Sequence, residues 1–373
     1  MTSSPRDPVR RPALAGRVAT WLVAVGIVVG LTAAVLVALA TISAVTGTAG
    51  LITGVVLAAV PVLPVAAILV WLDRYEAEPA PLLVFAFAWG AGAAALFALV
   101  VNTASMSALR AAGGDVTLAA VGVAPLVEET SKALAVVGIL LLRRREFDGV
   151  VDGIVYAGLA GLGFAFTENV LYLGRTLAES GTSGLAFVFI LRCVVSPFAH
   201  PLFTAASGIG LGLAARTRHP AARPWLVLGG WAVAVALHSA WNLSASTLRG
   251  FLTVYVLVQL PVLAGFAALA VLARRREGRV IARHLAVYVE TGWVSPAEVH
   301  MLASLAARRH ARTWASARGG RAGRAAMRRF QDLGSNLAFL RERVVRGTAG
   351  PDAAAEERRM LTELAQARAQ LVR

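Results

Sequence analysis

Long apolar runs fill most of the chain between residues 18 and 272, and they restrict it to a fold that lies within a membrane. A hydrocarbon core of about 30 Å needs about 20 apolar residues per helical span. Backbone polar groups in lipid must be hydrogen-bonded within the protein, and these runs lack the alternation of a transmembrane barrel. We therefore predict an all-α polytopic membrane protein with about eight transmembrane helices, at residues 18–44, 51–72, 82–101, 117–142, 150–173, 184–213, 225–248 and 252–272.

The composition supports this class and excludes others. Of the 373 residues, 57% are hydrophobic and only 15% are charged, whereas about 25% are charged in a typical soluble domain. This balance excludes intrinsic disorder and argues against a cytosolic enzyme. The single cysteine, Cys193, excludes an internal disulfide and cysteine-rich metal motifs.

Charge divides the chain into three predicted parts: a basic N-terminus at 1–17, a transmembrane domain at 18–272 and an Arg-rich helical tail at 273–373. The net charge is +15, and residues 274–373 contribute +11 of it. Arginines before the first span, after the fourth, between the sixth and seventh and after the eighth predict that both termini are cytoplasmic. We expect an integral plasma-membrane protein whose basic tail faces anionic lipid headgroups and binds no nucleic acid.

Two helices are expected in the tail. Ser295 and Glu298 have the spacing of a capping box, and Pro296 occupies the first helical position. A helix is therefore predicted from about Pro296 to Trp314. A second helix is predicted near residues 353–371.

Ionisable residues within the predicted spans are functional candidates, because each costs a few kcal/mol to insert. The fourth span carries Glu128, Glu129 and Lys132. Lys132 is the only lysine in the chain, and its spacing from Glu128 suits an ion pair on one helix face. A structural ion pair through Lys132 is one interpretation, and a functional site is the other.

The remaining candidates lie on the next three spans. They are Glu168 on the fifth, His200 on the sixth, and His238 with Asn242 on the seventh. At 1.5 Å per residue, Glu128, Glu168 and the two histidines lie roughly 20 to 27 Å above the cytoplasmic ends of their spans. Independent packing residues have no reason to share a depth, so we predict a single polar layer in the outer half of the membrane.

Such a layer suits the activation of water. A buried Glu can take a proton from water and later protonate a leaving amine, while His and Asn donate hydrogen bonds to an oxyanion. Alternatively, Glu168, His200 and His238 hold a divalent metal such as Zn²⁺ with an open position for water. The chain has no H-E-x-x-H motif, so a zincin-type site is excluded.

Residues of about 50–270 resemble the PrsW family of intramembrane proteases, which is related to the CAAX-protease and bacteriocin-processing membrane proteins. The resemblance rests on motifs in a fixed order on consecutive spans: Glu-Glu-x-x-Lys at 128–132, Phe-x-x-x-Glu-Asn at 164–169, His200 before Pro201, and His-x-x-x-Asn at 238–242. The loop Asp73-Arg74-Tyr75-Glu76-Ala77-Glu78-Pro79 is also similar to one found in this family.

The resemblance implies hydrolysis of a peptide bond in a membrane-anchored protein, of the anti-sigma-factor type, on the extracytoplasmic side. It implies that Glu128 or Glu129 is the general base and that His200, His238 and Asn242 are metal ligands or oxyanion donors. CAAX proteases have His where this chain has Glu168, which leaves open the partner that orients the water. The family has been described both as metallopeptidase and as glutamic-type.

Two other functions remain open from the residues alone. Buried carboxylates and histidines also serve proton- or cation-coupled transporters, although the spans show no obvious inverted repeat. A non-catalytic scaffold that binds single-pass helices is the other alternative.

Overall fold

The computed structural model describes residues 14–372 apart from 73, 76, 77, 145, 146, 148 and 246, and it does not describe the side chains of 14–20 or of 372. The predicted N-terminal region 1–17 and the loop residues Asp73, Glu76 and Ala77 thus lie wholly or partly outside the described part. The described residues form helices and no strand, which confirms the all-α prediction. The α-helices are α1 (Leu14–Ala59), α2 (Val62–Leu72), α3 (Ala80–Trp89), α4 (Ala95–Ala111), α5 (Ala124–Leu142), α6 (Val150–Phe189), α7 (Ala199–Arg216), α8 (Arg223–Ser244), α9 (Leu248–Val254), α10 (Leu260–Glu290), α11 (Pro296–Ala303), α12 (Leu305–Arg346) and α13 (Ala353–Val372).

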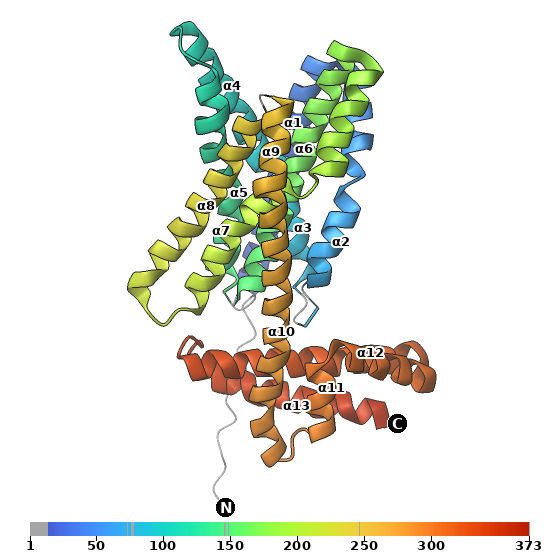
Figure 1. Ribbon diagram of the computed structural model, residues 1–373. Helices are drawn as coiled ribbons and strands as arrows, with labels where there is room; N and C mark the ends of the chain where they lie inside the picture. Colours follow the sequence, from blue (N-terminus) through green and yellow to red (C-terminus); the bar gives the residue numbers. More distant parts are fainter. Residues whose placement is uncertain are drawn as a thin grey trace, which may run out of the picture.

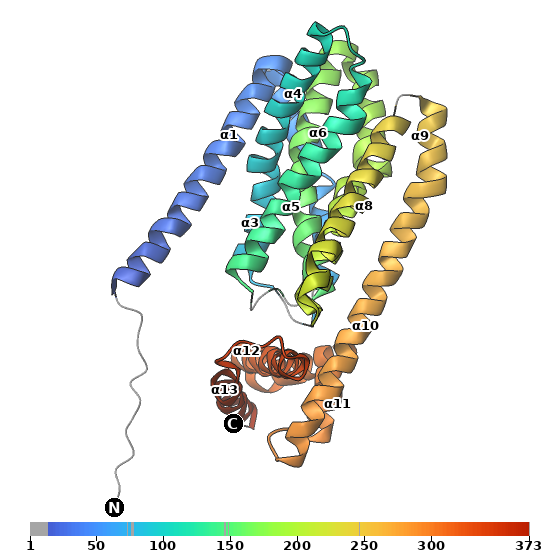
Figure 2. The ribbon, with the colours of Figure 1, turned by 90° about the vertical axis from the view of Figure 1, so that its left-hand side faces the viewer.

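The helices α1 to α10 form a tall bundle, and α11 to α13 lie across one end of it (Figures 1 and 2). Five stretches are long and apolar enough to cross a membrane, at Trp21–Leu72, Ala80–Ala111, Val150–Arg216, Pro220–Ser244 and Leu248–Glu290. The protein is therefore an integral membrane protein. The predicted number of eight spans is not established by these five stretches.

Two of the five stretches are too long to be single straight helices. α1 contains Gly47 at φ 71°, and α6 contains Gly181 at φ 64°. A left-handed backbone interrupts a right-handed helix, and glycine reaches it without steric cost. Beyond Gly47, Gly54 lies against Val170 and Leu69 lies against Gly158, so this part of the chain runs antiparallel to α6.

Close backbone contacts hold α6 at the centre of the bundle. A methyl group added at Gly153 would lie 2.0 Å from the carbonyl oxygen of Gly208 on α7. One added at Gly163 would lie 2.0 Å from the carbonyl oxygen of Phe87 on α3. Small residues permit this close approach. In lipid, where no hydrophobic effect acts between helices, the resulting van der Waals packing drives helix association. The fifteen consecutive residues 151–165 of α6 are consequently all buried.

The C-terminal helices pack around a core of their own. Ile281, Leu285, Leu302, Leu337 and Leu364 are all at most 1% exposed. These residues come from α10, α11, α12 and α13, and α10 continues without interruption through the predicted domain boundary at 272/273.

The predicted tail helices are partly confirmed. The capping box is present, since Ser295 Oγ accepts from the Glu298 amide and Glu298 accepts from the Ser295 amide. The predicted helix to Trp314 is wrong, because α11 ends at Ala303 and extended Ser304 caps the next helix by accepting from Ala307. The helix predicted near 353–371 is confirmed as α13.

Buried Arg308 joins the C-terminal unit to the bundle. Its side chain is 1% exposed and donates to the backbone oxygens of Leu302 (2.7 Å) and Tyr75 (3.2 Å) and to the Ser335 hydroxyl. The Tyr75 hydroxyl, from the loop after α2, donates to the Ala303 oxygen at 2.9 Å. Burial lowers the pKa of Arg308 to about 10.

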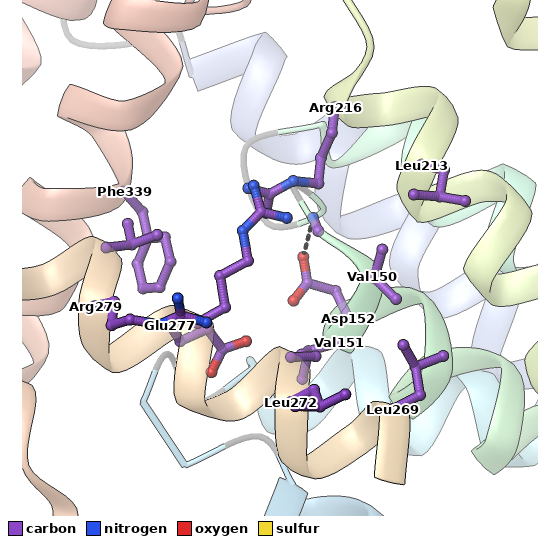
Figure 3. Close-up of a pocket in the computed structure, with 14 residues that line it drawn as sticks. Val150, Val151, Asp152, Leu213, Arg216, Leu269, Leu272, Glu277, Arg279 and Phe339 are labelled. Atoms are coloured by element: carbon purple, nitrogen blue, oxygen red, sulfur yellow. Dashed lines mark hydrogen bonds between the residues drawn. The ribbon is translucent and has the colours of Figure 1, made fainter. Parts of the chain in front are cut away.

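A cavity of about 320 Å³ lies between the bundle and the C-terminal helices (Figure 3). It is lined by the start of α6, the end of α7, the middle of α10 and Phe339 of α12. Asp152 faces it and accepts from the Gly149 amide at 2.8 Å, which caps α6. Glu168 lies 16 residues farther along α6, or about 24 Å. Asp152 is therefore far from the polar layer predicted from the sequence.

Candidate active site

The α5 helix presents Glu128, Glu129 and Lys132 on one face, because these positions are three and four residues apart. All three are buried, with Glu129 and Lys132 at 0% exposure. Lys132 Nζ donates to Glu129 Oε1 at 2.7 Å and lies 3.6 Å from Glu128 Oε2. The ammonium also lies 4.1 Å from the centre of the Phe164 ring. The predicted ion pair of Lys132 with Glu128 is present at 3.6 Å, and Lys132 pairs more closely with Glu129.

Glu129 uses both carboxylate oxygens. Besides Lys132, its Oε1 contacts His238 Nδ1 at 2.9 Å, and its Oε2 accepts from the Thr204 hydroxyl at 2.9 Å. Thr204 lies on α7 and His238 on α8. A fully buried carboxylate is tolerable only with such complete pairing, so Glu129 joins α5 to both neighbouring helices.

The two histidines lie against each other between α7 and α8. The His200 and His238 rings are 5.0 Å apart, edge to face. His200 Nε2 lies 2.8 Å from Glu168 Oε2, and its Nδ1 lies 3.3 Å from Lys132 Nζ. Each imidazole therefore has one nitrogen on a carboxylate, Glu168 for His200 and Glu129 for His238.

Arg192 pairs with Glu168, the carboxylate that also contacts His200. It lies in the π-helical turn Ile190–Val195 and donates to Glu168 Oε2 and, at 2.6 Å, to Asn169 Oδ1. Its guanidinium also stacks 4.1 Å from the Tyr172 ring. A forked pairing of this kind fixes the direction of both acceptors.

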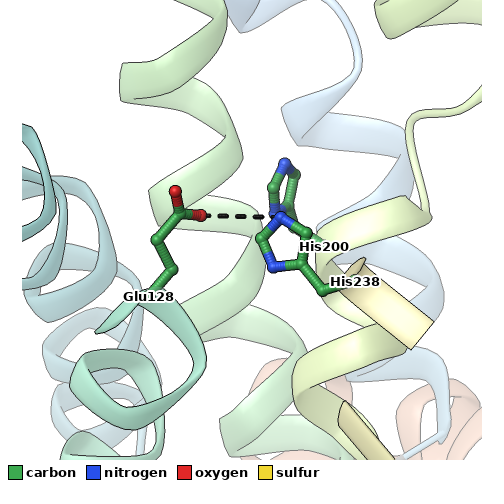
Figure 4. Close-up of side chains that lie close together, drawn as sticks. All are labelled: Glu128, His200 and His238. Carbon is green, nitrogen blue, oxygen red and sulfur yellow. Dashed lines mark ion pairs between the residues drawn. The ribbon is translucent and has the colours of Figure 1, made fainter. Parts of the chain in front are cut away.

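Glu128 differs from the other carboxylates of the cluster. Its Oε1 accepts from Asn102 Nδ2 on α4 at 3.1 Å. Its Oε2 is buried and has no hydrogen bond among the residues that the structure describes. Lys132 Nζ lies 3.6 Å from it, and His238 Nε2 lies 3.7 Å from it (Figure 4 shows the His238 contact). A buried oxygen without a hydrogen bond is costly, so it marks a place for a ligand or water.

The donor set fits a divalent metal ion. Glu128, His200 and His238 each offer an atom within 4.8 Å of the others. Carboxylates behind both imidazoles, from Glu129 and Glu168, are the arrangement that orients metal-bound histidines. The sequence predicted Glu168, His200 and His238 as ligands, whereas the structure groups Glu128 with the histidines and places Glu168 behind His200.

A small cavity of about 20 Å³ adjoins the cluster. His200, Asn169, Arg192 and Trp241 are among its lining residues. This volume is enough for about one water molecule, so the polar groups have a place for water beside them.

The structure brings together five of the six predicted catalytic residues: Glu128, Glu129, Glu168, His200 and His238. Asn242 lies one helical turn beyond His238, is half-buried, and donates to the Ala120 oxygen at 2.9 Å. The sequence analysis did not assign Asn102, Thr204 or Arg192 to the site. Arg192 carried a signal, because an arginine within an apolar run is costly.

Comparison with known proteins relates the chain to a family of proteases. A family described as "PrsW family intramembrane metalloprotease" matches residues 78–266. "Protease PrsW" of Clostridioides difficile (strain 630) is 31% identical over 150 residues, covering 39% of this chain and 61% of that protein. "Protease PrsW" of Oceanobacillus iheyensis is 34% identical over 143 residues, covering 38% and 60%. The match thus spans about three fifths of these curated relatives.

No solved structure matches the chain. The matched residues, 78–266, include the whole cluster of buried Glu, His and Lys side chains and cover half of the chain. On the strength of that match, this chain belongs to the PrsW family of intramembrane metalloproteases.

Proposed function

We propose that the protein is an intramembrane endopeptidase that hydrolyses a peptide bond of a membrane-anchored protein. The observation that carries the proposal is the Glu128 Oε2 atom, buried without a hydrogen bond beside two histidines. The other carboxylates of the cluster are engaged by partners, so Glu128 is the group free to act on a bound water.

Glu128 and Glu129 take different roles in this proposal. Glu128 accepts the proton of the attacking water and later returns it to the leaving amine. Glu129 is a positioning residue, because Lys132, His238 and Thr204 occupy both of its oxygens. By accepting from His238 Nδ1, Glu129 leaves Nε2 of that ring directed toward Glu128.

Glu168 positions His200 in the same way. It is held by Arg192 and contacts His200 Nε2. A divalent metal such as Zn²⁺ would be held by Glu128, His200 and His238 and would supply a Lewis acid that makes bound water more acidic, and Glu128 would then act as a ligand instead of the base. Without a metal, the same residues describe a glutamic-type site in which Glu128 activates the water as the general base.

A cleavage assay tests the proposal. Purified protein is reconstituted with a labelled single-pass model substrate in lipid vesicles, and the fragments are quantified. We expect Glu128→Gln to lower the cleavage rate by about 10²–10⁴-fold. Glu179→Gln, whose side chain is 59% exposed, should leave the rate unchanged. Cleavage by Glu128→Gln at the wild-type rate would refute the proposal.

Metal content separates the two mechanisms. Metal analysis of the purified protein is paired with dialysis against a chelator. Loss of cleavage that Zn²⁺ restores supports the metal ligands named above. Full activity in protein that contains no bound metal supports the glutamic-type site.

We also propose where the reaction takes place. Glu168 is the nineteenth residue of α6, about 27 Å from its start. If the basic tail lies in the cytoplasm, this height supports a position of the cluster in the outer half of the plasma membrane. A substrate of the anti-sigma-factor type, cut on the extracytoplasmic side, is compatible with that depth.

A further inference from the structure

A basic cavity of about 580 Å³ lies between the loop after α2 and the α12 helix, away from the buried Glu and His cluster. Among the described residues it is lined by five arginines, Arg74, Arg309, Arg312, Arg324 and Arg328, together with Thr313, Ser316 and Ala317. We refer to it below as the arginine cavity. No acidic side chain is among these lining residues.

The fold of α12 brings the arginines together. Arg309, Arg312 and Ser316 share one face of its first half, being three, four and seven residues apart. Gly320 then has φ 58° and ψ −141°, which interrupts the helix. A methyl group on Gly323 would lie 2.4 Å from the Ala315 oxygen, so the second half folds back along the first.

This reversal is fixed by buried polar contacts. Arg312 donates to Gln331 Oε1 at 2.7 Å, and Gln331 Nε2 donates to the Arg308 oxygen at 3.0 Å. Gln331 is 0% exposed. Arg324 and Arg328 on the second half are thereby held opposite the first half, so the arginine cavity is built by the fold.

Positive charge in the arginine cavity is poorly compensated. Burial lowers the pKa of Arg312, and the neighbouring guanidiniums of Arg328 and Arg74 lower it further. Asp332 opposes this effect. Among the described lining residues five are arginines and none is acidic, so their like charges repel one another, and a bound polyanion would relieve that repulsion.

The chemistry of the lining residues specifies the anion. Guanidinium groups pair with phosphate oxygens in a forked geometry, and the hydroxyls of Thr313 and Ser316 are additional donors. Arg74 lies two residues beyond the end of α2 at Leu72, where a membrane span leaves the bilayer. The cavity therefore lies at the height of lipid headgroups.

We propose that the arginine cavity is a phosphate-binding site, occupied by the phosphates of an anionic lipid headgroup. The shared chemistry is a phosphate-bearing polyanion, and a soluble phosphate compound is the other source. Surface arginines near anionic headgroups attract them individually, and here five converge on one cavity. This inference is independent of the proposed proteolysis, because binding alone reports on it.

The test uses purified full-length protein and two probes. Pyrophosphate is titrated into detergent-solubilised protein by calorimetry. Cardiolipin binding is measured by native mass spectrometry, with phosphatidylcholine as the uncharged comparison. The pocket variant is Arg324→Gln with Arg328→Gln, both exposed in the structure. The control variant is Arg321→Gln with Arg358→Gln, which removes the same charge from exposed sites outside the cavity.

We expect the pocket variant to bind about 30-fold more weakly, as for the removal of two cations near a phosphate, and the control variant to change less than threefold. Cardiolipin binding with weak pyrophosphate binding assigns the lipid source, and the reverse assigns a soluble phosphate. Equal weakening in both variants, or wild-type binding by the pocket variant, overturns the site. Thermal melting confirms that both variants are folded, and Arg309→Gln provides a second substitution within the cavity.

Discussion

Replacing the two adjacent glutamates of α5 by glutamine should affect different properties: Glu129→Gln should mainly lower stability, and Glu128→Gln should mainly lower activity. Glu129 is 0% exposed and pairs with Lys132 at 2.7 Å, His238 at 2.9 Å and Thr204 at 2.9 Å. Glu129→Gln leaves the buried ammonium with only the Glu128 carboxylate at 3.6 Å. Breaking one partner of a buried ion pair costs about 3–5 kcal/mol, so this variant should be strongly destabilised.

Glu128→Gln should be structurally mild and catalytically severe. Its side-chain oxygen can still accept from Asn102, and the other oxygen had no hydrogen bond to lose. The expected cost is about 1 kcal/mol, the net value of a single polar contact. Loss of the general base lowers the rate by about 10²–10⁴-fold.

Both variants are compared by reversible unfolding in mixed micelles, followed by tryptophan fluorescence, and by cleavage kinetics. Glu179→Gln is the matched control, because this glutamate is 59% exposed and pairs with Arg175 on the surface. Its cost should lie below about 1 kcal/mol. A larger stability loss for Glu128→Gln than for Glu129→Gln would refute the division of roles.

Three further outcomes are expected. Arg192→Lys removes the forked pairing with Glu168 and Asn169 and should lower kcat about 10- to 100-fold with KM unchanged. An unchanged kcat in cleavage kinetics would contradict the positioning role. Gly153→Ala places a methyl group 2.0 Å from a backbone oxygen and should lower the stability measured by thermal unfolding by more than about 1 kcal/mol. The control Gly229→Ala, with open space around the added methyl group, should not lower it. Equal melting temperatures of the two variants would argue against the tight packing. Arg308→Met leaves three acceptors without their donor and should lower the stability of the C-terminal unit by about 3 kcal/mol. The loss is measured as faster trypsin cleavage of the chain after α10. Unchanged proteolysis would show that this arginine does not hold the C-terminal unit.

The sequence predicts that the polar side chains of four helices lie at one depth, because the rise per residue of an α-helix is nearly independent of its side chains. A residue's distance from the end of its span gives its depth directly. Glu128, Glu168, His200 and His238 had similar depths on four helices, and the structure places them in one cluster. Depth alone says nothing about which face of each helix is inside, so the pairing of particular atoms was not predictable.

Other features depend on tertiary contacts that leave little trace in the sequence. Thr204 and Asn102 are neutral polar residues, which cost little in a membrane span and therefore give no warning of a role. The free oxygen of Glu128 follows from partners on α7 and α8 that engage Glu129 instead. In the tail, Gly319, Gly320 and Gly323 weakened the helical signal beyond Trp314, although the structure continues α12 to Arg346.

The glycine contacts around α6 set a limit on how this enzyme can adjust to a substrate. Side chains can change rotamer to make room, but a carbonyl oxygen packed against a glycine Cα has no such freedom. Glu168 stands on the same helix as these contacts, so its depth in the bilayer is fixed by the main chain. In the proposed reaction, a scissile bond must therefore be carried to that depth by the substrate, and the length of the substrate's own membrane anchor becomes a determinant of where it is cut.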